Sequence, residues 1–290
     1  MEQLNETQRY FIEEHVEDFR DGLIPRRELI RRVTLIAGSA ALATSILAAC
    51  DLSPRPAATT SSPAAASPAL VAQPFALAKP AAASGKVPGV VVIHENRGQT
   101  EHIKDVVRRV ATAGFVAINI DLAARAGGAA KLVDSAAYNA ELGKRGVADK
   151  LADHNATFAY LRSQTSGTAG VVGFCFGGGE VWNILAGGAP TELKAAVPFY
   201  GPQPANYTEL SKVKAAVSAV YAEQDTRITA TAPQMEEVLK QAGVPYAITV
   251  YPGVNHAFHN DTNAAGDRYN ATQAQKAWVA TIEWFRKYLA

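Results

Sequence analysis

Hydrophobic residues from about residue 73 onward fall into short continuous runs separated by amphipathic stretches. Continuous apolar, β-branched runs are typical of strands that are buried on both faces. We expect such strands at residues 89–94, 115–120, 194–199, 215–221 and 247–251, with one more ending at Gly173. Helical periodicity lies between them, at about 101–113, 134–163, 178–185, 234–242 and 272–289. The alternation predicts an α/β fold, a mainly parallel sheet with helices on both faces, in a single domain over residues 73–290.

The strand that ends at Gly173 leads into the sequence Gly173-Phe-Cys175-Phe-Gly177. This is the G-x-C-x-G form of a nucleophile elbow, in which a strand turns sharply into a helix. The turn needs residues without bulk on either side of the nucleophile, and glycine meets that need. A cysteine there would lie near the positive end of the following helix, which favours its ionised form. The alternative is a small buried residue beside a glycine-rich turn.

Polar residues follow several expected strands, and in a parallel sheet these positions gather at one edge, where ligands bind. Three of them occur in the chain order nucleophile, acid, histidine, which is the order of the α/β-hydrolase fold. In that arrangement the histidine takes the thiol proton and the acid orients the histidine. His259 is the rival to His256, which we prefer because it follows a strand and a glycine-containing loop directly. The polar residues at this edge are Glu95, Asp121, Cys175, Tyr200, Asp225 and His256.

The elbow also predicts where an oxyanion would be stabilised. Two backbone N–H groups are needed, and we expect those of Phe176, which follows the cysteine, and of Asn96, in the loop after the first strand.

The first part of the chain has a different composition. Arginine pairs at 26–27 and 31–32 precede an uncharged run, Val33–Ala49, that ends Ala-Ala-Cys50. Twin arginines before a moderately apolar segment are typical of a Tat export signal, and the ending resembles a lipobox with Cys50 as the lipidated residue. An uncleaved transmembrane helix is the alternative, because the run is nearly long enough to span a membrane.

Residues 50–72 then form the expected lipidated cysteine and a tether rich in Pro, Ala, Ser and Thr. The sequence thus predicts a leader at 1–49 and an exported, periplasmic or cell-envelope lipoprotein anchored to the membrane. Which arginine pair the exporter reads stays open.

Charge and cysteine content narrow the function. With 28 Lys and Arg against 27 Asp and Glu there is no excess of positive charge to indicate nucleic acid binding. The chain has two cysteines, so lipidation of Cys50 would leave Cys175 as an unpaired thiol. An unpaired thiol in an exported protein fits catalysis better than structure.

Five segments resemble the dienelactone hydrolase (carboxymethylenebutenolidase-like) family, from about Pro88 to the C-terminus. Among family branches, the one with the H-E-N-R-G loop is most similar, and its members often carry a Tat-type leader. The segments begin at Val92 (VIHENRG), Gly173 (GFCFGGG), Phe199 (FYG), Ala222 (AEQDTRI) and Tyr251 (YPGVNHAFHND).

The resemblance implies a single α/β-hydrolase domain that hydrolyses a lactone or enol ester through a cysteine acyl-enzyme, without metal or cofactor. It implies Cys175 as nucleophile, His256 as base and Asp225 as the acid that orients it. Glu95 matches a glutamate that helps to generate the thiolate; the alternative is a surface loop carboxylate.

The family's best-known members hold a substrate carboxylate with an arginine for which no match here is clear. The candidate substrate-binding residues are Arg125, Lys131, Arg145, Arg97, Arg227 and Tyr200.

We therefore expect a cysteine hydrolase of a small lactone or activated ester. The rivals are a broader carboxylesterase or thioesterase with the same triad, and an envelope protein of this fold that binds a small ligand without turnover. A thiol redox sensor is disfavoured because no resolving cysteine would remain. The expected partners are a small-molecule substrate, the membrane and the Tat machinery.

Overall fold

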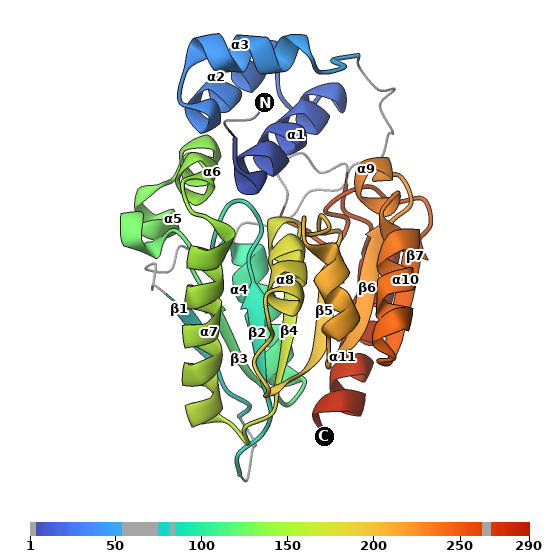
Figure 1. The fold of residues 1–290 in the computed structure, drawn as a ribbon. Coiled ribbons are helices and arrows are strands. Elements are labelled where there is room, and N and C mark those ends of the chain that lie inside the picture. Colours follow the sequence, from blue (N-terminus) through green and yellow to red (C-terminus); the bar gives the residue numbers. More distant parts are fainter. Residues whose placement is uncertain (1–3, 54–74, 82–84, 263–267) are drawn as a thin grey trace.

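A computed structural model describes residues 4–53, 75–81, 85–262 and 268–290. Its centre is a seven-stranded sheet with the order β1-β3-β2-β4-β5-β6-β7 (Figure 1). All neighbouring strands are parallel except β1, which pairs antiparallel with β3. The strands are β1 (Phe75–Ala78), β2 (Gly89–Ile93), β3 (Val116–Ile120), β4 (Ala169–Phe174), β5 (Leu193–Phe199), β6 (Ala216–Ala222) and β7 (Tyr246–Tyr251).

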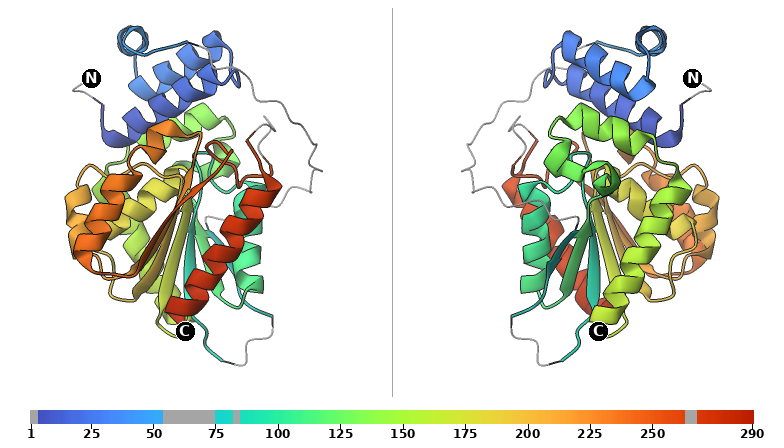
Figure 2. Two further views of the ribbon diagram at one scale, coloured as in Figure 1. Left: turned by 90° about the vertical axis from the view of Figure 1, so that its right-hand side faces the viewer. Right: turned by 90° about the vertical axis from the view of Figure 1, so that its left-hand side faces the viewer.

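The apolar runs predict the central strands because both faces of the sheet are covered. Every residue of β2, β4 and β6 is buried, whereas β7 is partly exposed at the edge of the sheet. Helices α4 (Glu101–Thr112) and α11 (Ala271–Leu289) cover one face. Helices α7 (Val147–Gln164), α8 (Phe176–Ala186) and α10 (Ala232–Ala242) cover the other (Figure 2). The predicted α/β fold is confirmed.

Two elements differ from the sequence prediction. The helix expected over 134–163 is two helices, α6 (Ser135–Gly143) and α7. They separate because Gly146 is extended, at φ −68° and ψ 165°, where α7 begins. Strand β1 was not expected from the sequence. The remaining short helices are η1 (Ala124–Ala126), α5 (Gly128–Lys131), η2 (Tyr207–Lys212) and α9 (Thr226–Thr229).

The N-terminal segment forms three helices above the carboxyl edge of the sheet, α1 (Glu6–Arg20), α2 (Arg26–Ala37) and α3 (Ala40–Ala48) (Figure 1). A capping box between Asn5 and Gln8 starts α1. Helix α2 packs against α6, and Arg31 of α2 forms a 2.7 Å ion pair with Asp134 at the start of α6.

The expected leader, residues 1–49, therefore packs against the hydrolase-like domain, residues 73–290, in the folded chain. Export and lipidation stay predictions, and most of the expected tether lies outside the described residues. Within the described part of the chain, no single helix is long and apolar enough to cross a membrane. Helices α2 and α3 reach that length only together, across a bend of 118°.

Candidate active site

Cys175 occupies the predicted elbow between β4 and α8. Its backbone lies at φ 58° and ψ −120°, a conformation that non-glycine residues rarely adopt and that is common at functional sites. The Cys175 N–H donates to Phe199 O at 3.1 Å, which ties the turn to β5. A Cβ on Gly173 would collide with the Gly177 carbonyl, and one on Gly177 would lie 2.5 Å from Ile93 O. The flanking glycines are therefore required by close backbone packing.

Asp225 and His256 form the second part of the site. Asp225 ends the loop after β6, and His256 lies in the loop after β7; Oδ2 of Asp225 is 2.6 Å from Nδ1 of His256. His259, the rival histidine, lies away from this pair. Its ring packs between Phe174 and Trp278, and its Nδ1 is 3.4 Å from Nε2 of His102.

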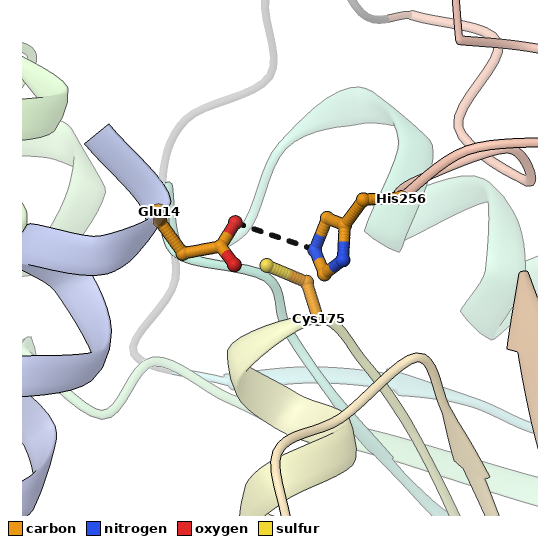
Figure 3. A group of neighbouring side chains, drawn as sticks. All are labelled: Glu14, Cys175 and His256. Atoms are coloured by element: carbon orange, nitrogen blue, oxygen red, sulfur yellow. Dashed lines mark ion pairs between the residues drawn. The ribbon is translucent and has the colours of Figure 1, made fainter. Parts of the chain in front are cut away.

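The sulfur of Cys175 and a ring nitrogen of His256 lie within 4.8 Å of one another and of a carboxylate oxygen of Glu14 (Figure 3). Within the described ranges, these three residues form the cluster of His, Cys, Asp or Glu side chains close enough to share one metal ion. Glu14 comes from α1, and its carboxylate lies 3.4 Å from Nε2 of His256. The hydroxyl of Tyr10, one turn earlier on α1, lies 3.1 Å from the sulfur, and either atom can be the donor.

A cavity of about 500 Å³ opens beside these residues. Five residues predicted for the site line this cavity. They are Glu95, Asn96 and Arg97 in the loop after β2, together with Cys175 and His256. Helices α1 and α2 supply the opposite wall through Glu14, Asp18 and Arg32.

Glu95 is buried rather than a surface carboxylate. Its Oε2 accepts a short hydrogen bond from the side-chain amide of Asn260, and its Oε1 has no hydrogen-bond partner among the described residues. Tyr200 is also fully buried, with φ 35° and its ring 5.0 Å from that of His256. Burial, with Glu95 and Cys175 nearby, raises the pKa of Tyr200 well above its ordinary value.

The charge states of the central pair follow from burial and from the carboxylates around it. Burial would lower the pKa of His256, but Glu14, Asp225 and the Cys175 sulfur outweigh it and hold that pKa well above its ordinary value. Burial also raises the pKa of Cys175, helped by Glu14 and opposed by His256. The two carboxylates therefore favour the imidazolium form of His256, and burial with Glu14 favours the neutral thiol of Cys175.

The candidate cationic residues separate into two groups. Arg227, on α9, is mostly buried and pairs closely with Glu14, with Glu13 at 3.4 Å and the Tyr10 ring at 5.5 Å. Arg125 is 74% exposed and pairs with Asp153 at 2.6 Å, outside the wall of the cavity. The structure therefore brings Arg97 and Arg227 near the candidate site and leaves Arg125 on the surface.

Sequence reasoning missed the contribution of α1. Tyr10 and Glu14 lie on one face of a helix that the sequence assigns to a leader. The available signal was amphipathic periodicity in the acidic segment before the arginines, which predicts a helix but not what it contacts.

The parallel sheet, the strand–cysteine–helix turn, and an acid and a histidine after later strands define the class of protein as an α/β-hydrolase fold. The family model of the "Dienelactone hydrolase family" matches residues 75–289. The chain belongs to this family, and it is a hydrolase of this type.

Similar proteins agree with that assignment. A "Putative carboxymethylenebutenolidase" of Methylorubrum extorquens is 33% identical over 221 residues, 71% of this chain and 74% of the relative. A protein of Escherichia coli K12 with the same description is 31% identical over 226 residues, 73% and 81% of the two chains. The crystal structure of a "Putative Dienelactone Hydrolase" of Klebsiella pneumoniae is similar with a TM-score of 0.65 and 30% identity. The match covers 74% of this chain and 92% of the Klebsiella chain.

Proposed function

We propose that the protein hydrolyses a small lactone or an activated, enol-type ester through an acyl-enzyme on Cys175, as a member of the H-E-N-R-G branch. The observation that carries the proposal is the strained backbone of Cys175 at the elbow, with the Asp225–His256 pair beside it. His256 takes the thiol proton and later activates water, and Asp225 holds the tautomer that leaves Nε2 free for this.

A cysteine nucleophile favours ester over amide substrates. A thiolate is readily acylated by a substrate with a good leaving group such as an enolate, whereas an amine leaves poorly. The backbone N–H of Phe176, at the first residue of α8, and that of Asn96 are the proposed oxyanion donors. Arg97, in the cavity wall, and Arg227, beside it, are the proposed partners of an anionic group on the substrate.

A turnover assay tests this proposal. The family model matches residues 75–289, and the similar Klebsiella structure is covered over 92% of its own chain. Residues 73–290 are therefore assayed beside the full chain on enol-lactones and p-nitrophenyl esters. We expect hydrolysis by residues 73–290 and a loss of at least about 10³-fold in Cys175→Ala. A Cys175→Ala protein that kept its rate would contradict the proposed nucleophile. Stoichiometric binding without product would favour the ligand-binding rival, and turnover of simple esters or thioesters alone would favour the broader esterase.

We further propose that the chain is a Tat-exported lipoprotein of the cell envelope, lipidated on Cys50 and tethered by residues 50–72. The support is the sequence of arginine pairs, apolar run and Ala-Ala-Cys50 ending. Membrane fractionation of wild type and Cys50→Ala in a Tat-competent bacterium tests it. We expect the variant to leave the membrane fraction, and equal partitioning of the two proteins would contradict lipidation.

A further inference from the structure

Helix α1 lies across the candidate active site (Figures 1 and 3). Tyr10 and Glu14 are four residues apart, so they share one face of the helix. That face points at the catalytic pair, with Tyr10 at the sulfur and Glu14 at Nε2 of His256. A substrate carbonyl must approach the same sulfur, and Nε2 is the atom that must take the thiol proton. Helix α1 therefore blocks the sulfur of Cys175 and Nε2 of His256, the two atoms on which the proposed reaction depends.

Glu14 also changes the chemistry of the pair. In a reactive thiolate–imidazolium pair, the sulfur supplies the negative charge that faces the imidazolium. Here the Glu14 carboxylate supplies that charge, and Asp225 supplies a second one at Nδ1. With carboxylates at both ring nitrogens, the imidazolium keeps its protons and the sulfur keeps its own.

We propose that α1 is an intramolecular inhibitor, which holds the uncleaved chain inactive by replacing the substrate at Cys175 and the thiolate at His256. This inference rests on the proposed function, because it assigns a regulator to that same site. It concerns the segment before residue 75, which lies outside the part matched by the family model.

Opposite charges and apolar packing hold α1 in place. Glu14 pairs with Arg227, and Asp21, just after the helix, pairs with Arg268 at 2.7 Å. The ring of Phe11 is fully buried 5.3 Å from that of Phe176, the residue after Cys175. These contacts run along α1 from Phe11 to Asp21, so the helix is anchored before and after Glu14.

The inhibitor would be released together with the predicted leader. Helix α3 ends at Ala48, and cleavage before Cys50 would separate all three helices from the hydrolase domain. The chain would then be silent before export and active after it. Any other event that lifts α1 would have the same effect.

The test uses the full chain and two readouts. The first is the rate at which iodoacetamide alkylates Cys175, followed by peptide mass mapping so that Cys50 is scored separately; the second is hydrolysis of p-nitrophenyl acetate. Phe11→Asp places a charge in an apolar contact, and Glu14→Gln removes the ion pairs with Arg227 and His256. Glu6→Gln is the matched control, since Glu6 is an exposed carboxylate on the same helix.

We expect Phe11→Asp and Glu14→Gln to raise both rates by at least about tenfold. Both rates depend on the fraction of molecules in which α1 has moved away from Cys175, and both substitutions increase that fraction. Glu6→Gln should match wild type. Glu14→Gln preserves the shape of the side chain, so it keeps the test decisive if Phe11→Asp misfolds.

The two readouts separate the two proposals. Equal alkylation of Cys175 in wild type and both variants would overturn the inhibitor. Faster alkylation with slower hydrolysis would overturn it too, because α1 would then complete the active site. If the variants are alkylated faster but no protein hydrolyses the ester, residues 73–290 included, α1 covers Cys175 as proposed. The proposed hydrolase chemistry would then be refuted.

Discussion

The carboxylate of Asp225 and Nδ1 of His256 lie 2.6 Å apart, although 31 residues separate them in the chain. The contact joins the loops after β6 and β7, two neighbouring strands, and it leaves the other ring nitrogen directed to the sulfur side of the site. Burial would raise the pKa of Asp225, but the proton on His256 and the nearby Arg227 outweigh it and lower that pKa. Asp225 is therefore an ionised carboxylate that accepts a hydrogen bond from the Nδ1–H of His256.

Asp225→Asn tests this orienting role. The amide can donate to Nδ1, which would favour the wrong tautomer, so we expect hydrolysis by residues 73–290 to fall about 10²–10⁴-fold in kcat. Glu223→Gln, an exposed neighbour, is the control and should retain its rate. An Asp225→Asn enzyme with wild-type kcat would exclude this carboxylate from the mechanism.

Gly177→Ala tests the close packing at the elbow. Alanine normally favours a helix over glycine, yet its Cβ would lie 2.5 Å from Ile93 O and 2.6 Å from His94 O. Because backbone atoms cannot give way easily, we expect a loss of about 1–3 kcal/mol in the free energy of unfolding. Gly85→Ala, where a Cβ meets open space, should change it little in the same urea titration. A stabilised Gly177→Ala protein would contradict the packing described.

A buried charge cluster between α7 and α8 predicts that the stability of the protein depends on pH. Glu180 lies 2.9 Å from Nζ of Lys150 and 3.2 Å from Nε2 of His154. Burial would raise the pKa of Glu180, but the Lys150 ammonium and the hydrogen bond with His154 outweigh burial and lower that pKa to about 2.

A lowered carboxyl pKa contributes stability that is complete above the unfolded pKa of about 4.3 and is lost as the pH falls toward 2. The contribution is on the order of 3 kcal/mol. In urea titrations at pH 7, 5 and 3, the free energy of unfolding of wild type should therefore fall with pH. Glu180→Gln should lack this part of the decrease.

Glu180→Gln should also be less stable than wild type at pH 7, because Lys150 would keep a buried charge without its carboxylate. The exposed Glu236→Gln should follow wild type at every pH. Parallel curves for wild type and Glu180→Gln between pH 7 and pH 3 would contradict the assigned charge.

The fold and the elbow could be predicted because their signals are local. A strand covered on both faces must be apolar throughout, and a nucleophile between closely packed backbones needs Gly173 and Gly177 beside it. The positions of Glu95 and His256 followed from the same logic, since residues after parallel strands meet at one edge.

Other features depend on contacts that no local pattern contains. Glu14 and Arg227 are 213 residues apart, and an acidic amphipathic segment before an apolar run has the same composition whether it is free or packed. Strand β1 lies in an Ala- and Pro-rich segment without a β-branched run, and it forms because the edge of β3 is available for pairing. The ion pair of exposed Arg125 with Asp153 likewise joins η1 to α7, which no local pattern shows.

The most direct test of the account is intact mass spectrometry of residues 73–290 mixed with a p-nitrophenyl ester or an enol-lactone. We expect a transient increase in protein mass equal to one acyl group. The added mass should map to Cys175, decay as product forms and be absent in Cys175→Ala. Product release without any adduct, or an adduct on a residue other than Cys175, would contradict the cysteine mechanism.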